Sequence, residues 1–264
     1  MTWDWIALGA KDILGLVLAA RLLVMRLPGV YRTLSLVVLY ESLGSSVLFL
    51  MQLGYGRFLD YRLVWAGLSA LGWVMTLWIV YALLEAVLEH LPGILHFSRR
   101  LLNFTFLAAV ILALLTAKPE FSVNAGSAGG EAIGYLVVIT VVMERVISTV
   151  ALLVLLAILA FVVWFPVQMP KNLVVLSLGL VVYFLSRTGL LLARSFFSRG
   201  TSQIFSTVSM FVLSACFSYW AIGITREGES GSLRIGHGWR RSEQQRLILQ
   251  LENMNAALLR GARR

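Results

Sequence analysis

Charged side chains inside apolar sequence are the residues of this chain best placed to do chemistry within a membrane. Arg21 and Glu41 lie in two consecutive apolar segments, and Glu144 and Arg187 lie in two later ones. A charge at the centre of a membrane helix costs about 2.5 to 3.5 kcal/mol on insertion scales, so such residues are expected to be paired or functional. We predict two helix-locking pairs, Arg21 with Glu41 and Glu144 with Arg187. The alternative is a polar cavity or ion path lined by Glu41, Glu85 and Glu144.

Motifs for metals, cofactors or enzymatic catalysis are missing from the sequence. His90 and His96 flank a Pro-Gly turn close to Glu85 and Glu89, but their spacing matches no standard metal site. The last lysine, Lys171, precedes the final two apolar segments, which excludes a retinal Schiff base in the last span. Neither a Gly-x-Ser-x-Gly elbow nor a metalloprotease histidine pair is present. We therefore expect no metal and no cofactor, and no nucleophile with a base can be named.

The composition requires a membrane environment. Of the 264 residues, 59% are apolar and 13% are charged, against roughly 45 to 50% (glycine included) and about 25% in soluble domains. Seven apolar blocks of about 17 to 25 residues can each cross a hydrocarbon layer of about 30 Å at about 1.5 Å per residue. All five prolines fall between the blocks. We predict an all-α, polytopic seven-helix bundle in the lipid bilayer, with spans at residues 5–25, 34–53, 63–84, 101–117, 143–165, 173–193 and 204–224.

The fifth block belongs to a longer apolar stretch, residues 132–165, which is interrupted at Glu144 and Arg145. This length is too great for one perpendicular crossing and too small for two crossings with a loop. We predict one long helix that protrudes beyond the outer surface.

Basic residues indicate the orientation of the spans. Thirteen Lys and Arg fall in the connections on the tail side and in the tail, against five in the connections of the other side. By the positive-inside rule the N-terminus is outside and the tail is cytoplasmic. In a soluble protein a net charge of +9 would suggest a nucleic-acid partner, but here the same asymmetry is the signature of a membrane protein's cytoplasmic face. We expect no nucleic-acid partner.

The tail is predicted to be a linker followed by a short helix. Residues 226–241 are basic and rich in Gly and Ser, as linkers are. Residues 242–264 have helical periodicity, and their apolar positions are spaced 4, 3 and 4 apart, like one seam of a coiled coil. This seam consists of Leu247, Leu251, Met254 and Leu258. Such a helix is marginal alone, so its apolar stripe needs a second copy, a cytoplasmic partner or the membrane surface.

The order of features resembles a group of seven-span membrane proteins that is common in acidobacterial genomes and has no known activity. The resemblance is carried by a long fifth helix that contains Glu144-Arg145, by a Trp- and Pro-containing turn at residues 164–170, and by the following span that contains Gly179 and Arg187. It covers most of the chain in layout. It implies a bacterial origin, and therefore a place in the inner membrane.

Two classes of function fit these features. The first is a non-enzymatic module, a sensor or a scaffold, that couples the bundle to the cytoplasmic tail helix. The second is a small transporter or channel that uses the intramembrane carboxylates. Carboxylates facing a hydrated cavity without a partner favour transport, whereas carboxylates paired inside a solid bundle count against it. An enzyme that acts on lipid ranks third.

Overall fold

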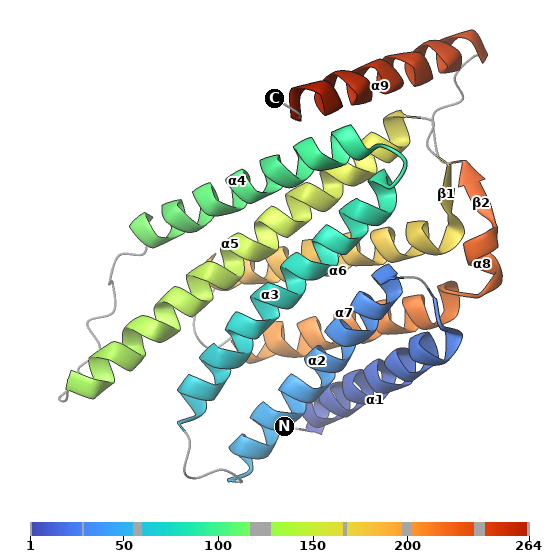
Figure 1. Cartoon of the computed structure of the whole chain (residues 1–264). Coiled ribbons are helices and arrows are strands. Elements are labelled where there is room, and N and C mark those ends of the chain that lie inside the picture. The colour runs from blue at the N-terminus through green and yellow to red at the C-terminus, as the bar shows by residue number, and fades with distance from the viewer. Residues whose placement is uncertain are drawn as a thin grey trace.

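The computed structural model describes residues 2–27, 29–54, 60–116, 128–165, 168–196, 202–234 and 241–262. Within these residues the chain is helical except for one two-stranded sheet and short connections (Figure 1). The elements in chain order are α1 (Thr2–Met25), α2 (Gly29–Gln52), α3 (Tyr61–Leu88), α4 (Pro92–Thr116), α5 (Ala128–Trp164), β1 (Gln168–Pro170), α6 (Lys171–Phe196), α7 (Ser202–Gly223), α8 (Glu227–Ser230), β2 (Ser232–Arg234) and α9 (Arg241–Ala262).

Six of the described helices, α2 to α7, are long and apolar enough to cross a membrane. They indicate a multi-pass membrane protein. The first predicted span corresponds to α1, which has 24 residues but is not among the six. The reason is its charge: every stretch of 18 residues in α1 contains Lys11 and Asp12 together with Asp4, Arg21 or both. The all-α multi-pass character is therefore confirmed, and a count of seven spans depends on α1.

The helices extend beyond the predicted spans. Helix α4 begins at Pro92 rather than at residue 101, and α5 begins at Ala128 rather than at residue 143. Hydropathy marks the part of a helix that fits in lipid, whereas backbone hydrogen bonds continue into the polar flanks. Helix α5 has 37 residues, or about 55 Å at about 1.5 Å per residue, which is longer than the hydrocarbon layer. One long helix is thus observed where the apolar stretch of residues 132–165 predicts one, and Glu144 and Arg145 do not break it.

Six helices form a closed ring. Helix α1 packs against α2 and α7, α2 against α3, α3 against α5, and α6 against both α5 and α7. The ring is filled by side chains such as Leu34, Leu83, Leu155, Phe184 and Phe217, each 0% or 1% exposed. Helix α4 lies outside this ring, against α5 and α9 and less closely against α3 (Figure 1).

The described part of the expected linker 226–241 that follows α7, residues 226–234, is structured, whereas residues 235–240 lie outside the described residues. It contains α8 and β2, and β2 pairs antiparallel with β1 so that Met169 lies opposite Leu233. The fully buried Asn172 holds this segment, since its Nδ2 donates to the Thr225 carbonyl at 2.6 Å and its Oδ1 accepts from the Thr225 N–H at 3.1 Å. Composition alone cannot reveal these contacts, because they join residues about 50 positions apart.

Candidate functional site

Arg187 on α6 lies between two carboxylates that come from two other helices. Its Nη2 is 2.9 Å from Glu144 Oε1 on α5, and its Nη1 is 3.5 Å from Glu41 Oε1 on α2. The three side chains are each about a quarter exposed, at 22 to 25%. We call Glu41, Glu144 and Arg187 the carboxylate cluster. The predicted pairing of Glu144 with Arg187 is present, and the structure adds Glu41 to it.

Tyr183 completes this arrangement and was not singled out in the sequence. Its hydroxyl donates to Glu41 Oε1 at 3.2 Å and accepts a hydrogen bond from Arg187 Nη1. Tyr183 lies one helical turn before Arg187, and the guanidinium carbon is 5.7 Å from its ring centroid, within the range of a cation–π interaction. An i, i+4 Tyr and Arg pair in an apolar helix is the signal that could have identified it.

The carboxylate cluster lines a cavity of about 180 Å³ that also contacts Phe205 and Ser209 of α7. If all three groups are ionised, two carboxylates share one guanidinium and the cluster carries one net negative charge. Glu85, the third carboxylate of the predicted ion path, is not in this cavity. It forms an ion pair of 2.9 Å with Arg99, and its side chain is 61% exposed. The cavity therefore combines polar lining with paired carboxylates, and so has features of both predicted alternatives.

A second polar group joins α1 to α2. Lys11 is buried, and its Nζ lies 3.3 Å from Asp12 Oδ1 and 2.5 Å from Ser45 Oγ. The Asp12 carboxylate accepts hydrogen bonds of 2.8 Å from Ser45 and from Ser46. Lys11 also donates to the backbone carbonyl of Glu41 at 3.1 Å, next to the carboxylate cluster. Lys11 and Asp12 of α1 thus compensate each other's charge inside the bundle.

Arg21 has other partners than the predicted Glu41. Its guanidinium donates to the backbone carbonyls of Ala221 and Ile224, at the end of α7. The reason is the register of α1 against α2, in which Ser35 donates to the carbonyl of Ala19. In this antiparallel register Arg21 lies near Thr33 of α2, and Glu41 lies about two helical turns, or about 11 Å, further along the axis. In the predicted orientation Arg21 and Glu41 both lie in the inner halves of their spans, but that does not place them at the same level.

Helix α9 docks on the N-terminus of α4 in the same chain. Asn255 Oδ1 accepts hydrogen bonds from the backbone N–H of Gly93 at 2.7 Å and of Ile94 at 3.2 Å. These N–H groups belong to the first turn of α4, where no carbonyl of the helix can accept them. Pro92 before them lacks an N–H, and the Leu95 N–H after them donates to the Leu91 carbonyl at 2.9 Å, so the side chain of Asn255 satisfies the two donors that remain. Asn255, which directly follows Met254 of the predicted seam, was the available signal.

The docked face of α9 differs from the predicted seam at one position. Leu251 is 8% exposed and belongs to the same buried cluster as Ile94 of α4, and Leu258 packs against that cluster. Leu247 is half-buried, but Met254 is 45% exposed, and Asn255 takes its place on the buried face. The straight helix buries positions spaced 4, 4 and 3 apart, whereas the seam was drawn with a 4, 3, 4 spacing. The stripe is covered by α4, so neither a second copy nor a partner is needed to bury it.

Neither a metal site among the described residues nor a similar protein gives a further indication of function. Among the described residues no group of three or more His, Cys, Asp or Glu side chains is placed to hold a metal ion. Comparison of the chain with protein-family models, with curated proteins and with solved structures finds no match. The inference of function therefore rests on the geometry.

Proposed function

We propose that this chain is a non-enzymatic membrane module, a sensor or a scaffold, in which a seven-helix bundle is coupled to the C-terminal helix α9. The observation that carries this proposal is the bond between Asn255 and the first turn of α4. Helix α4 lies outside the ring, so it can shift against α3 and α5 while the ring stays closed. A shift of α4 changes the surface on which α9 docks, and so transmits a change in the bundle to the tail.

Exposed side chains of α9 provide the surface for an output. Leu249 is 59% exposed, Met254 is 45% exposed and Ile248 is 37% exposed. Arg246 and Arg260 are exposed on the same helix. Exposed apolar side chains beside arginines suit a cytoplasmic protein, a second copy of the chain or an anionic membrane surface.

The proposal includes a topology with seven spans, an outer N-terminus and a cytoplasmic α9 in a bacterial inner membrane. Helix α1 serves as the seventh span because it lies in the ring between α2 and α7, and because Lys11 and Arg21 are bonded inside the protein. Cysteines at Ser127 and at the exposed Ser230 test this topology, since the native Cys216 is buried. An impermeant reagent should label position 127 in intact cells and position 230 after permeabilisation. The reverse pattern, or labelling of both positions from one side, contradicts it.

A distance measurement tests the coupling. Spin labels at Glu252 on α9 and at Ser230 on α8, both exposed, report the position of α9 relative to the ring in lipid nanodiscs. A sensor should show two distance populations whose ratio changes with lipid composition or with pH. One distance under all conditions, equal to that of a variant locked by a disulfide between α9 and α4, rejects the sensor and leaves a scaffold. A tail without any defined distance rejects both.

A second candidate function is the transport of protons or small cations. It is favoured by the cavity of about 180 Å³ that the carboxylate cluster lines, whereas the pairing of both carboxylates with Arg187 counts against it. Proteoliposomes with an internal pH dye or cation dye test this function. A transporter should produce flux above that of empty vesicles, and Glu41→Gln should abolish it without changing protein yield. No flux above the empty-vesicle level removes this candidate.

A further inference from the structure

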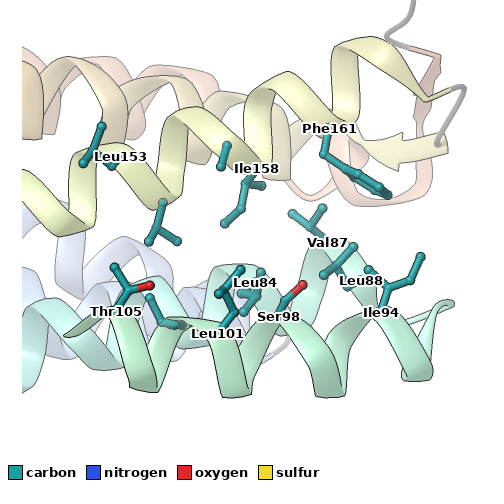
Figure 2. A pocket seen from close by; sticks show the side chains of 13 residues that line it. Leu84, Val87, Leu88, Ile94, Ser98, Leu101, Thr105, Leu153, Ile158 and Phe161 are labelled. Carbon is teal, nitrogen blue, oxygen red and sulfur yellow. The ribbon is translucent and has the colours of Figure 1, made fainter. Parts of the chain in front are cut away.

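An apolar crevice of about 310 Å³ lies between α4 and α5, with α3 as its floor (Figure 2). Its volume is within the roughly 300 to 1,000 Å³ that is typical of small-molecule sites. Two of the lining residues, Ser98 and Thr105 on α4, carry hydroxyl groups, and the other lining side chains are hydrocarbon. A site with this lining selects an apolar ligand, because a buried polar group would lack partners.

The crevice opens sideways, toward the lipid. Its floor is formed by Leu84, Val87 and Leu88 of α3, which are 4 to 5% exposed. Its rim is exposed on both sides: Leu101 of α4 is 53% exposed and Leu153 of α5 is 60% exposed. A ligand therefore enters between two membrane helices rather than from water.

The crevice is long and narrow. On α4 its lining runs from Ile94 to Thr105, a rise of about 16 Å at about 1.5 Å per residue. On α5 the lining runs from Leu153 to Phe161, which gives about 12 Å in the same way. One leaflet is half of a hydrocarbon layer of about 30 Å. The crevice thus has the length of one leaflet and the shape of a single extended chain.

Two arginines of α4, Arg99 and Arg100, lie within the length of the lining, although neither side chain lines the crevice. Arg99 is held by Glu85 at 2.9 Å. Arg100 is exposed and directly precedes Leu101, and a long arginine side chain can reach a phosphate at the interface. We propose that the crevice binds one acyl chain of an anionic phospholipid from the leaflet on the α9 side, with the headgroup at Arg100.

Ile94 connects this site to the tail. Its side chain lines the crevice, and its backbone N–H donates to Asn255 of α9 at 3.2 Å. A chain that enters the crevice contacts α4 at the turn on which α9 docks. This consequence for α9 rests on the proposed coupling, whereas the binding of the lipid chain does not.

Photo-crosslinking tests the binding. The full chain is reconstituted in phosphatidylethanolamine vesicles that contain phosphatidylglycerol with a diazirine in one acyl chain, and adducts are mapped by mass spectrometry. Adducts should concentrate on crevice residues such as Leu101 and Val154 rather than on Ile222, which is 78% exposed on α7. Ala157→Trp fills the rim of the crevice and should lower crevice adducts at least about fivefold. Ala160→Trp is the matched control on α5, since Ala160 is exposed but does not line the crevice.

A separate variant tests the role of the lipid headgroup. Arg100→Gln should lower crevice adducts of the phosphatidylglycerol probe and leave those of a phosphatidylethanolamine probe unchanged. Equal labelling of the crevice and Ile222 overturns the site, as does an equal effect of the two tryptophan variants. Equal crevice labelling by the two probes in the unmodified protein overturns the anionic headgroup. If the adducts behave as expected but Ala157→Trp leaves the distance between Glu252 and Ser230 unchanged, the lipid site stands and the coupling fails.

Discussion

Asn255 caps helix α4 through a 2.7 Å hydrogen bond to its Oδ1 from the backbone N–H of Gly93, which lies 162 residues earlier in the chain. Removing this cap should release α9. Asn255→Ala is expected to cost about 1 to 2 kcal/mol of docking free energy, because two N–H groups of α4 lose their acceptor. Limited proteolysis of α9 measures this change. Asn253→Ala is the matched control, since Asn253 is exposed on the same helix. Asn255→Asp should retain the docking, because aspartate also caps helix N-termini.

Gly93 should not tolerate a side chain. A Cβ there would meet the backbone oxygen and Oδ1 of Asn255, and would lie 3.1 Å from Leu259 Cγ. Gly93→Leu should therefore separate α9 from α4 without loss of the membrane bundle, and the distance between spin labels on α9 and α8 should broaden. Gly67→Leu is the control, because a Cβ at Gly67 meets nothing within 4 Å. Equal spectra for the two variants would contradict the docking.

Arg187→Gln should be the most damaging single change in the carboxylate cluster. It leaves Glu41 and Glu144 without their guanidinium, and the loss of one partner of a buried pair typically costs about 3 to 5 kcal/mol. The thermal unfolding midpoint in detergent should fall accordingly. The triple variant that also contains Glu41→Gln and Glu144→Gln should recover part of the loss.

The control for this prediction is Arg99→Gln. Arg99 and Glu85 form an exposed ion pair, and such pairs contribute at most about 1 kcal/mol. A loss in Arg187→Gln that is no larger than in Arg99→Gln would mean that the cluster is solvated rather than buried in the bundle.

Arg21 and Glu41 should behave independently. Arg21 bonds the α7 carbonyls of Ala221 and Ile224, and Glu41 contacts Arg187. The unfolding free-energy losses of Arg21→Gln and Glu41→Gln are therefore expected to add to within about 0.5 kcal/mol in the double variant. A double variant that is more stable than Arg21→Gln alone would restore the pairing predicted from the sequence.

The helices and the membrane class were predictable because they depend on local free energies. An apolar stretch of about 20 residues has a lower free energy in lipid than in water, and its backbone must form a helix in lipid. The long α5 follows from the same rule, since no proline lies within residues 132–164 and the adjacent charges Glu144 and Arg145 do not break the helix. The Glu144 and Arg187 pair was predictable because lipid leaves few alternatives to two opposite charges at similar depth.

Lateral packing was not predictable in the same way. In lipid every apolar helix face is equally well solvated, so the order of helices depends on small residues, hydrogen bonds and the fit of side chains. Hydropathy gives no sign that α4 lies outside the ring or that Arg21 points to α7. Hydropathy also does not show that Asn255, rather than Met254, lies on the buried face of α9. Asn255 lies there because it accepts hydrogen bonds from two N–H groups at the start of α4 that have no acceptor within that helix. The sequence therefore determines which segments are helical and membrane-compatible, whereas contacts between distant residues determine which charges meet and where the tail docks.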